Sequence, residues 1–205
     1  MAITLYALKP RFQALLRPVV RGMAGAGITA NQVTVAAAAG SVALGAALAA
    51  WGPGQPALFV MLPLWLVLRM GLNAIDGMLA REFDQKSRLG AFLNELGDVV
   101  SDAALYLPFA LLAPFGAGWV AVVVILAVTG ELAGALGQTV GADRRYDGPL
   151  GKSDRALAFG ALGLWIAVAP IPAALAWTMP ALAALAAWTI VNRVRRALAA
   201  PGERA

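Results

Sequence analysis

Long apolar runs alternate with short polar ones along almost the whole chain. Six of these runs reach the length that a helix needs to cross the hydrocarbon core of a bilayer, about 20 residues. They lie near residues 30–51, 57–80, 88–113, 117–140, 155–171 and 173–197. The pattern therefore predicts an all-α integral membrane protein with six transmembrane helices.

A shorter amphipathic stretch precedes the first apolar run. Residues 10–22 mix leucines and valines with arginines, which is typical of a helix that lies in the membrane interface, here with a kink at Pro18. We therefore divide the chain into an N-terminal interfacial segment (1–28), a six-helix membrane domain (29–198) and a C-terminal tail (199–205).

Composition agrees with a membrane protein and limits the chemistry. Of 205 residues, 60% are hydrophobic and only 13% are charged. The chain contains neither cysteine nor histidine, which excludes thiolate and imidazole ligands and a cysteine nucleophile. Any metal must therefore be bound by oxygen, which favours Mg, Mn or Ca over Zn.

The basic residues predict how the helices are oriented in the membrane. Apart from Arg69, every Lys and Arg falls into one of four clusters, namely Lys9–Arg21, Arg81–Arg88, Arg144–Arg155 and Arg193–Arg204. With six spans, these clusters lie on one side, and the loops on the other side carry no charge. Because basic loops stay inside, we expect an inner-membrane protein with both termini and its active site in the cytoplasm. Orientation and anionic lipid account for the positive charge, so we expect no nucleic-acid partner.

Two stripes of polar residues stand inside the second and third predicted helices, where such residues are costly and usually functional. At intervals of three or four residues, each stripe lies on one face of its helix. The stripes are Arg69, Asn73 and Asp76 on the second helix, and Asn94, Asp98 and Asp102 on the third. The short connection 82–88 makes these helices antiparallel neighbours, so the stripes can face each other.

Two interpretations of these stripes are open. Asp76 and Asp98 would repel each other at close range, and no lysine is placed in the sequence to neutralise them, which favours a divalent metal between them. The alternative is a structural role, with interhelical hydrogen bonds and an ion pair from Arg69 to Asp102 or Glu131. Glu131 is either that partner or a polar wall of the cavity.

Residues 73–98 follow a fixed pattern, N-x-x-D-G-x-x-A-R, then eight residues, then G-x-x-x-N-x-x-x-D. This pattern closely resembles the signature of the CDP-alcohol phosphotransferase (CDP-alcohol phosphatidyltransferase) family, in which Asp stands at the positions of Asn73 and Asn94. The six spans, the interfacial helix and the segment 27–34 also resemble the family. The likeness is greatest to bacterial members of unassigned substrate.

The resemblance implies a metal-dependent transfer of a phosphoalcohol group from a CDP-linked donor to an acceptor alcohol, with release of CMP. It also implies a homodimer. By likeness, the ligands of Mg or Mn are Asn73, Asp76, Asn94 and Asp98, and Asp98 is also the general base. The residues that by likeness frame the CDP donor are Gly77, Ala80, Arg81 and Gly90.

The two asparagines lower the formal charge of the motif from minus four to minus two, so its affinity for divalent cations should fall. Three outcomes are open: one metal instead of two, rescue by Asp102 or Glu95, or loss of catalysis. The last outcome would leave a non-catalytic protein that binds nucleotide or lipid. We expect that catalysis is retained, because the rest of the motif is intact.

The fourth loop is a second candidate surface. Lys152 and Arg155 are our first candidates for binding the acceptor, and Arg144 could bind a phosphate on either substrate. Membrane orientation and contact with lipid headgroups explain the same residues equally well. We expect CDP-diacylglycerol as donor, although a CDP-linked small alcohol acting on a lipid hydroxyl fits the sequence too. A transporter is disfavoured, since no repeat of broken helices occurs.

Overall fold

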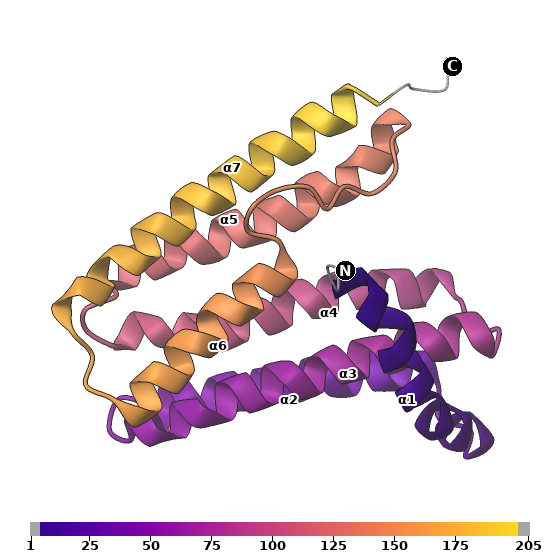
Figure 1. Ribbon diagram of the computed structural model, residues 1–205, viewed down its shortest axis with the longest axis horizontal. Helices are drawn as coiled ribbons and strands as arrows, with labels where there is room; N and C mark the ends of the chain where they lie inside the picture. The colour runs from indigo at the N-terminus through magenta and orange to yellow at the C-terminus, as the bar shows by residue number, and fades with distance from the viewer. Residues whose placement is uncertain (1–4, 201–205) are drawn as a thin grey trace.

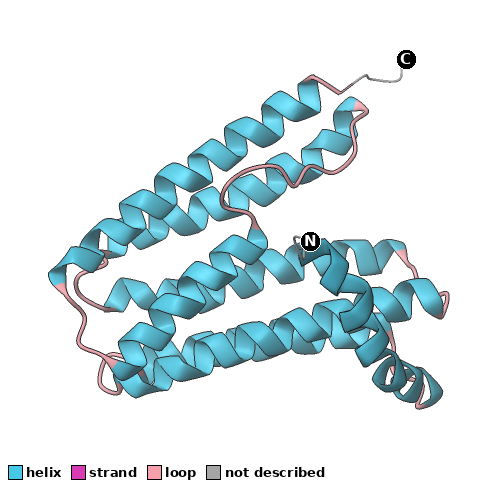
Figure 2. Ribbon diagram, viewed as in Figure 1, coloured by secondary structure: helices cyan, strands magenta, loops and turns pink. Residues whose placement is uncertain are grey.

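The computed structural model describes residues 5–200, with side chains from residue 12 onward. In this part of the chain every regular element is helical (Figure 2). The α-helices are α1 (Leu5–Gly25), α2 (Ala30–Trp51), α3 (Met61–Glu82), α4 (Arg88–Tyr106), α5 (Ala117–Leu136), α6 (Lys152–Val168) and α7 (Thr178–Leu198). Short 3₁₀ turns are η1 (Pro56–Val60), η2 (Leu107–Leu111), η3 (Gly137–Val140) and η4 (Ala173–Trp177). Most of the predicted tail 199–205 lies outside the described residues, as do the side chains of Lys9 and Arg11.

Each of the six predicted runs corresponds to one of the helices α2 to α7. Among the described residues, four helical segments are long and apolar enough to cross a membrane, namely Ala30–Trp51, Pro56–Glu82, Ala117–Val140 and Ala173–Leu198. Helix α4 carries several carboxylates, and α6 has 17 residues, so neither meets the same criteria. The chain is thus a helical membrane protein with four candidate spans, and crossing by α4 and α6 remains a prediction.

The helices pack as two groups that diverge toward one end (Figure 1). Helix α2 packs against α3 and α4, α6 packs against α3, and α5 lies along α7. The crossing of α2 and α4 is especially close at Gly45. A Cβ there would lie 2.2 Å from the carbonyl oxygen of Ala104, so only glycine lets the two backbones touch.

A cluster of aromatic side chains packs toward the end of the bundle at which the uncharged loops lie. The rings of Tyr106 and Phe159 stack with centroids 3.9 Å apart. The ring of Phe109 meets those of Phe159 and Phe59 edge to face, at 5.1 and 5.3 Å. All four side chains are fully buried. The aromatic core thus lies at this end of the bundle, and the polar residues lie at the opposite end.

Helix α1 is longer than the predicted stretch 10–22 and contains two prolines in one continuous helix. Its Val20 is fully buried and packs with Val33 of α2 and Met78 of α3 in one apolar cluster. The guanidinium of Arg17 pairs with the carboxylate of Glu82 at the end of α3, at 3.0 Å. This contact places α1 beside the second loop, while its location in a membrane interface remains a prediction.

The basic clusters converge at one end of the bundle. The second loop (83–87) and the fourth loop (141–151) line a common cavity. Near the C-terminus, Arg196 contacts Asp147 of the fourth loop at 3.2 Å, and α1 adjoins the end of α3. This arrangement agrees with a one-sided distribution of basic residues, and the cytoplasmic identity of that side remains a prediction.

Candidate functional site

A cavity of about 1010 Å³ opens at the end where the basic loops meet. Its volume is at the upper end of the range that is usual for ligand pockets, roughly 300–1,000 Å³. Helices α2, α3, α4, α5 and α7, the second loop and the start of α6 all contribute to its wall. Every fixed position of the sequence pattern lines it, namely Asn73, Asp76, Gly77, Ala80, Arg81, Gly90, Asn94 and Asp98. Two residues of each polar stripe therefore face a common space, whereas Arg69 and Asp102 do not line it.

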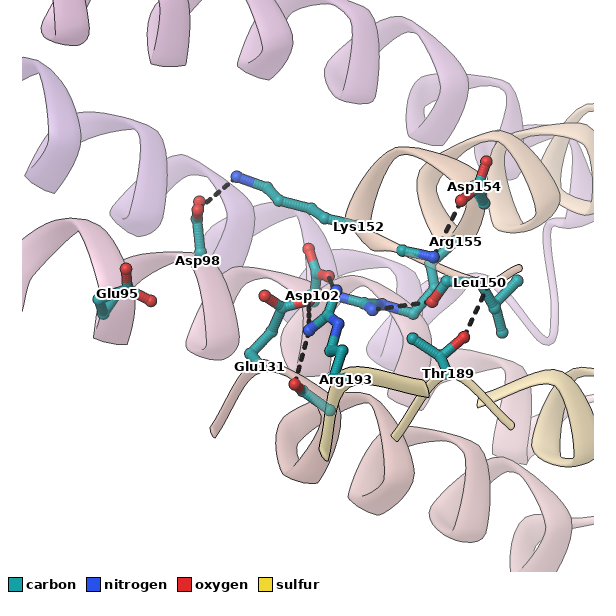
Figure 3. A network of polar contacts seen from close by, with 12 residues as sticks. Glu95, Asp98, Asp102, Glu131, Leu150, Lys152, Asp154, Arg155, Thr189 and Arg193 are labelled. Atoms are coloured by element: carbon teal, nitrogen blue, oxygen red, sulfur yellow. Dashed lines mark hydrogen bonds and ion pairs between the residues drawn. The ribbon is translucent and has the colours of Figure 1, made fainter. Parts of the chain in front are cut away.

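Asp98 contacts three polar side chains in this wall. Its Oδ1 accepts hydrogen bonds from Nη2 of Arg69 at 3.1 Å and from Nδ2 of Asn73 at 3.4 Å. Its Oδ2 contacts the ammonium group of Lys152, the first residue of α6 (Figure 3). The expectation that no lysine neutralises the two acids is thus wrong for Asp98, because the fourth loop folds Lys152 back over α4.

Asp76 has a different neighbour. Its Oδ2 accepts a hydrogen bond of 2.9 Å from the hydroxyl of Thr34 on α2. The side chain is almost fully buried, whereas that of Asp98 keeps 22% of its surface exposed. Sequence reasoning did not name Thr34 or the nearby Asn31 as site residues, although their spacing of three at the start of an apolar run places them on one helical face.

The two glycines of the pattern keep the wall open for polar groups. A Cβ at Gly77 would lie 3.0 Å from Nη2 of Arg81, so the guanidinium group rests over the bare backbone. A Cβ at Gly90 would lie 2.8 Å from Oδ1 of Asn31. A larger residue at either position would displace a side chain that lines the cavity.

A buried ion-pair network lies directly beside Asp98 (Figure 3). Asp102 accepts from Arg69 at 2.6 Å and from Arg155 at 3.0 Å, and Arg155 also donates to Glu131 at 2.9 Å. The structural alternative, an ion pair from Arg69 to Asp102, is therefore present. Neither Asp102, considered as a substitute metal ligand, nor Arg155, expected to bind the acceptor, lines the large cavity.

Arginines from three elements meet at Glu131 on α5. Besides Arg155, its carboxylate contacts Arg144 of the fourth loop at 3.1 Å and Arg193 of α7 at 3.4 Å. Arg144 also forms an ion pair with Glu95, and its burial lowers the pKa of its guanidinium, against the opposing effect of Tyr146. Glu131 thus serves as a polar wall of the cavity. Arg193 was missed as a cavity residue because the sequence places it in a cluster that orientation explains.

The donor atoms in the cavity suit a hard cation. Asp76, Asp98, Asn73 and Asn94 offer carboxylate and amide oxygens only, the ligands that Mg²⁺ and Mn²⁺ prefer. Among the side chains that the structure describes, no three carboxylates come together as a ready metal site. Two carboxylates, one of them already paired with basic groups, fit a single divalent ion better than two.

An apolar groove adjoins the cavity. It has a volume of about 630 Å³ and runs between α3 and α6 along exposed apolar side chains such as Val67 and Leu157. Asn73, Lys152 and Ser153 line both the groove and the cavity, so the two spaces adjoin at these residues.

Comparison with known proteins identifies relatives over almost the whole chain. Residues 27–191 match the family model described as CDP-alcohol phosphatidyltransferase. Inner membrane protein YnbA of Escherichia coli (strain K12) is 47% identical over 199 residues, which cover 96% of this chain and 97% of YnbA.

Solved structures share the fold. Phosphatidylinositol phosphate synthase PgsA1 of Mycobacterium tuberculosis, in complex with manganese and citrate, superposes with a TM-score of 0.74 and 24% identity, covering 92% of each chain. The same enzyme with CDP-DAG bound gives the same TM-score and identity, covering 92% of this chain and 96% of the other.

Proposed function

Because the chain belongs to the CDP-alcohol phosphatidyltransferase family, we propose that it transfers a phosphatidyl group from CDP-diacylglycerol to an acceptor alcohol and releases CMP. One observation carries this proposal: every fixed position of the family pattern lines a single cavity of about 1010 Å³. A cavity of this size accommodates a nucleoside diphosphate together with a small second substrate.

The apolar groove favours a lipid as the donor. Because it adjoins the cavity at Asn73 and Lys152, a diphosphate could lie among the polar groups while an acyl chain follows α3 and α6. A CDP-linked small alcohol would leave the groove without a ligand unless the acceptor were the lipid. The structurally similar PgsA1 was solved with CDP-DAG bound, which supports the same donor here.

Individual side chains of the cavity can then be given separate roles in the reaction. The acceptor oxygen attacks the phosphorus that bears the diacylglycerol, and Asp98 takes the hydroxyl proton. The anhydride bond to the CMP phosphate breaks, and CMP leaves with the bonding electron pair. Arg81, whose guanidinium lies over Gly77, and Lys86 at the second loop would neutralise charge on the diphosphate.

A divalent cation fits this site as a cofactor. Asp76, Asp98 and the amide oxygens of Asn73 and Asn94 would hold it. When bound, the ion would offset negative charge on the bridging and leaving oxygens of the diphosphate. Manganese in the structure of PgsA1 supports a choice between Mn and Mg. With two carboxylates and Lys152 beside Asp98, we propose one ion rather than two.

The orientation of the protein in the membrane and its assembly are proposed from its likeness to the family. We propose a six-span domain over residues 29–198 in the inner membrane, with both termini and the cavity facing the cytoplasm. The interfacial segment 1–28 would lie along that face. We also propose a homodimer, which light scattering on the purified protein in detergent would test.

A non-catalytic role is the second candidate, and the contacts of Asp98 favour it. A carboxylate held by Lys152, Arg69 and Asn73 must give up a partner before it can serve as ligand or base. If none of these contacts yields, the cavity would bind CDP-diacylglycerol without turning it over.

One assay separates the two candidates. Purified protein is incubated with CDP-diacylglycerol, Mg²⁺ or Mn²⁺ and a panel of uncharged, zwitterionic and phosphorylated alcohols, and released CMP is measured. We expect CMP with at least one alcohol, and its loss in Asp76→Ala but not in the control Glu82→Gln, whose ion pair lies outside the cavity. Donor binding without CMP from any alcohol would instead support the non-catalytic role.

A further inference from the structure

The basic side chains around the cavity form two groups with different partners. At the end formed by the second loop, Arg81 and Lys86 line the cavity, and neither has a carboxylate within ion-pair distance among the described side chains. At the opposite end, formed by the fourth loop, α6 and α7, the basic residues are Arg144, Lys152 and Arg193, and every one of them is paired.

Arg144 illustrates how strongly these residues are neutralised. Its guanidinium forms ion pairs with Glu95 of α4 and, at 3.1 Å, with Glu131 of α5. Only 18% of its side chain is exposed, and 9% of that of Glu131. The two carboxylates hold Arg144 from both sides, so an incoming anion would meet negative charge beside the guanidinium.

The positive charges of Arg193 and Lys152 are also neutralised by carboxylates. Arg193 donates to the carbonyl oxygen of Gly130 at 2.5 Å and contacts Glu131 at 3.4 Å, while the ammonium of Lys152 contacts Asp98. Breaking such a pair is costly wherever it leaves a buried charge without its partner. A phosphate monoester carries nearly two negative charges, so at this end it would have to displace Glu95 or Glu131.

We propose that this end of the cavity takes an acceptor alcohol without a phosphate group, and that Glu95 determines this specificity by neutralising Arg144. The inference rests on the proposed transferase function, in which the diphosphate of the donor lies at the end with Arg81 and Lys86. Hydroxyl groups can use the hydrogen-bonding surface of this end, whereas a second phosphate meets Arg144 and Arg193 already paired with Glu95 and Glu131.

Glu95 is the carboxylate that can be changed with the least effect on folding. Its side chain is 39% exposed and lines the cavity, whereas Glu131 is buried in contact with three arginines. Glu95→Gln keeps the size and polarity of the side chain and removes its charge. Glu82→Gln is the matched control, because Glu82 is 35% exposed and pairs with Arg17 outside the cavity.

The experiment measures binding of glycerol 3-phosphate, with saturating CMP present to occupy the end with Arg81 and Lys86. Affinities are determined by calorimetry for the native protein, Glu95→Gln, Glu82→Gln and the double variant Glu95→Gln with Arg144→Gln. We expect Glu95→Gln to bind roughly tenfold more tightly than the native protein, because a repelling charge next to the anion is gone. Glu82→Gln should match the native protein, and the double variant should lose the gain.

Two results would overturn the inference. The first is that glycerol 3-phosphate binds the native protein as tightly as it binds Glu95→Gln. The second is that Glu95→Gln gains an affinity that persists without Arg144. Both results would mean that the pairing of Arg144 does not control anion binding. Failure of the proposed transferase function has a separate signature, since it would appear as absent CMP release from CDP-diacylglycerol with every alcohol tested.

Discussion

Asp98 is the carboxylate of the family pattern with the most polar contacts. Arg69, Lys152 and Asn73 all contact its carboxylate, and we propose it as the general base. The asparagines at 73 and 94 leave the site with two carboxylates where the family pattern has four. These differences predict a site that binds divalent cations weakly.

Restoring the missing charges should therefore strengthen metal binding. In the double variant Asn73→Asp with Asn94→Asp, we expect the dissociation constant for Mn²⁺ to fall roughly tenfold or more, because hard cations prefer charged oxygen ligands. Titration of Mn²⁺ followed by electron paramagnetic resonance would measure it. Asp84→Asn, in the exposed second loop, serves as a charge control of opposite sign. An unchanged dissociation constant would show that positions 73 and 94 are not ligands.

At the scale of single residues, the sequence predicted positions that depend on short-range helical spacing. It did not predict contacts between residues far apart in the chain. Helical periodicity predicted that Asp76 and Asp98 face one cavity, because the residues between them form two helices and a short loop. The contact of Lys152 with Asp98 depends on how the fourth loop folds, and no periodic pattern specifies that. The same limit explains why Arg193 was overlooked and why Arg155 was expected to reach the acceptor.

Helices α2 and α4 pack closely against each other. The contact brings the backbone of Gly45 against the carbonyl of Ala104, and it supports the helix that carries Asn94 and Asp98. The length of the apolar runs predicted the bounds of α2 to the residue, whereas the run 88–113 continues past the end of α4 at Tyr106 through η2. It could not predict which helices touch, because lipid-facing and protein-facing apolar residues look alike in a membrane protein.

A side chain at position 45 should destabilise this contact. In Gly45→Val the new atoms would overlap the backbone of α4, and we expect a loss of roughly 1–3 kcal/mol in the free energy of unfolding, the usual cost of overpacking. Gly71→Ala is the control, because nothing lies within 4 Å of a Cβ there. Thermal unfolding in detergent would measure both. Equal melting temperatures for Gly45→Val and the native protein would contradict the close packing.

The molecule as a whole is polar at one end and aromatic at the other. Basic clusters from the second loop, the fourth loop and α7 gather around the cavity, while the loop at Gln55 lies at the end with the aromatic cluster. Charge distribution along the sequence predicted this division, because only an even number of spans brings all basic clusters to one side.

The absence of cysteine allows a direct test of orientation. Gln55→Cys and Ala199→Cys each introduce a single thiol at an exposed position. In intact bacterial cells, an impermeant maleimide should label Gln55→Cys, and it should label Ala199→Cys only after the membrane is opened. The cysteine-free native chain gives the background. Labelling of Ala199→Cys in intact cells would contradict a cytoplasmic C-terminus.

The central claim is that Asp98 acts on the acceptor in a cavity that binds a CDP-linked lipid. The most direct test compares the rate of CMP release from CDP-diacylglycerol by the native protein and by Asp98→Asn, with donor binding measured on the same preparations. We expect the rate to fall by about 10²–10⁴-fold, as loss of a general base predicts, while the donor still binds. An unchanged rate in Asp98→Asn would contradict the account.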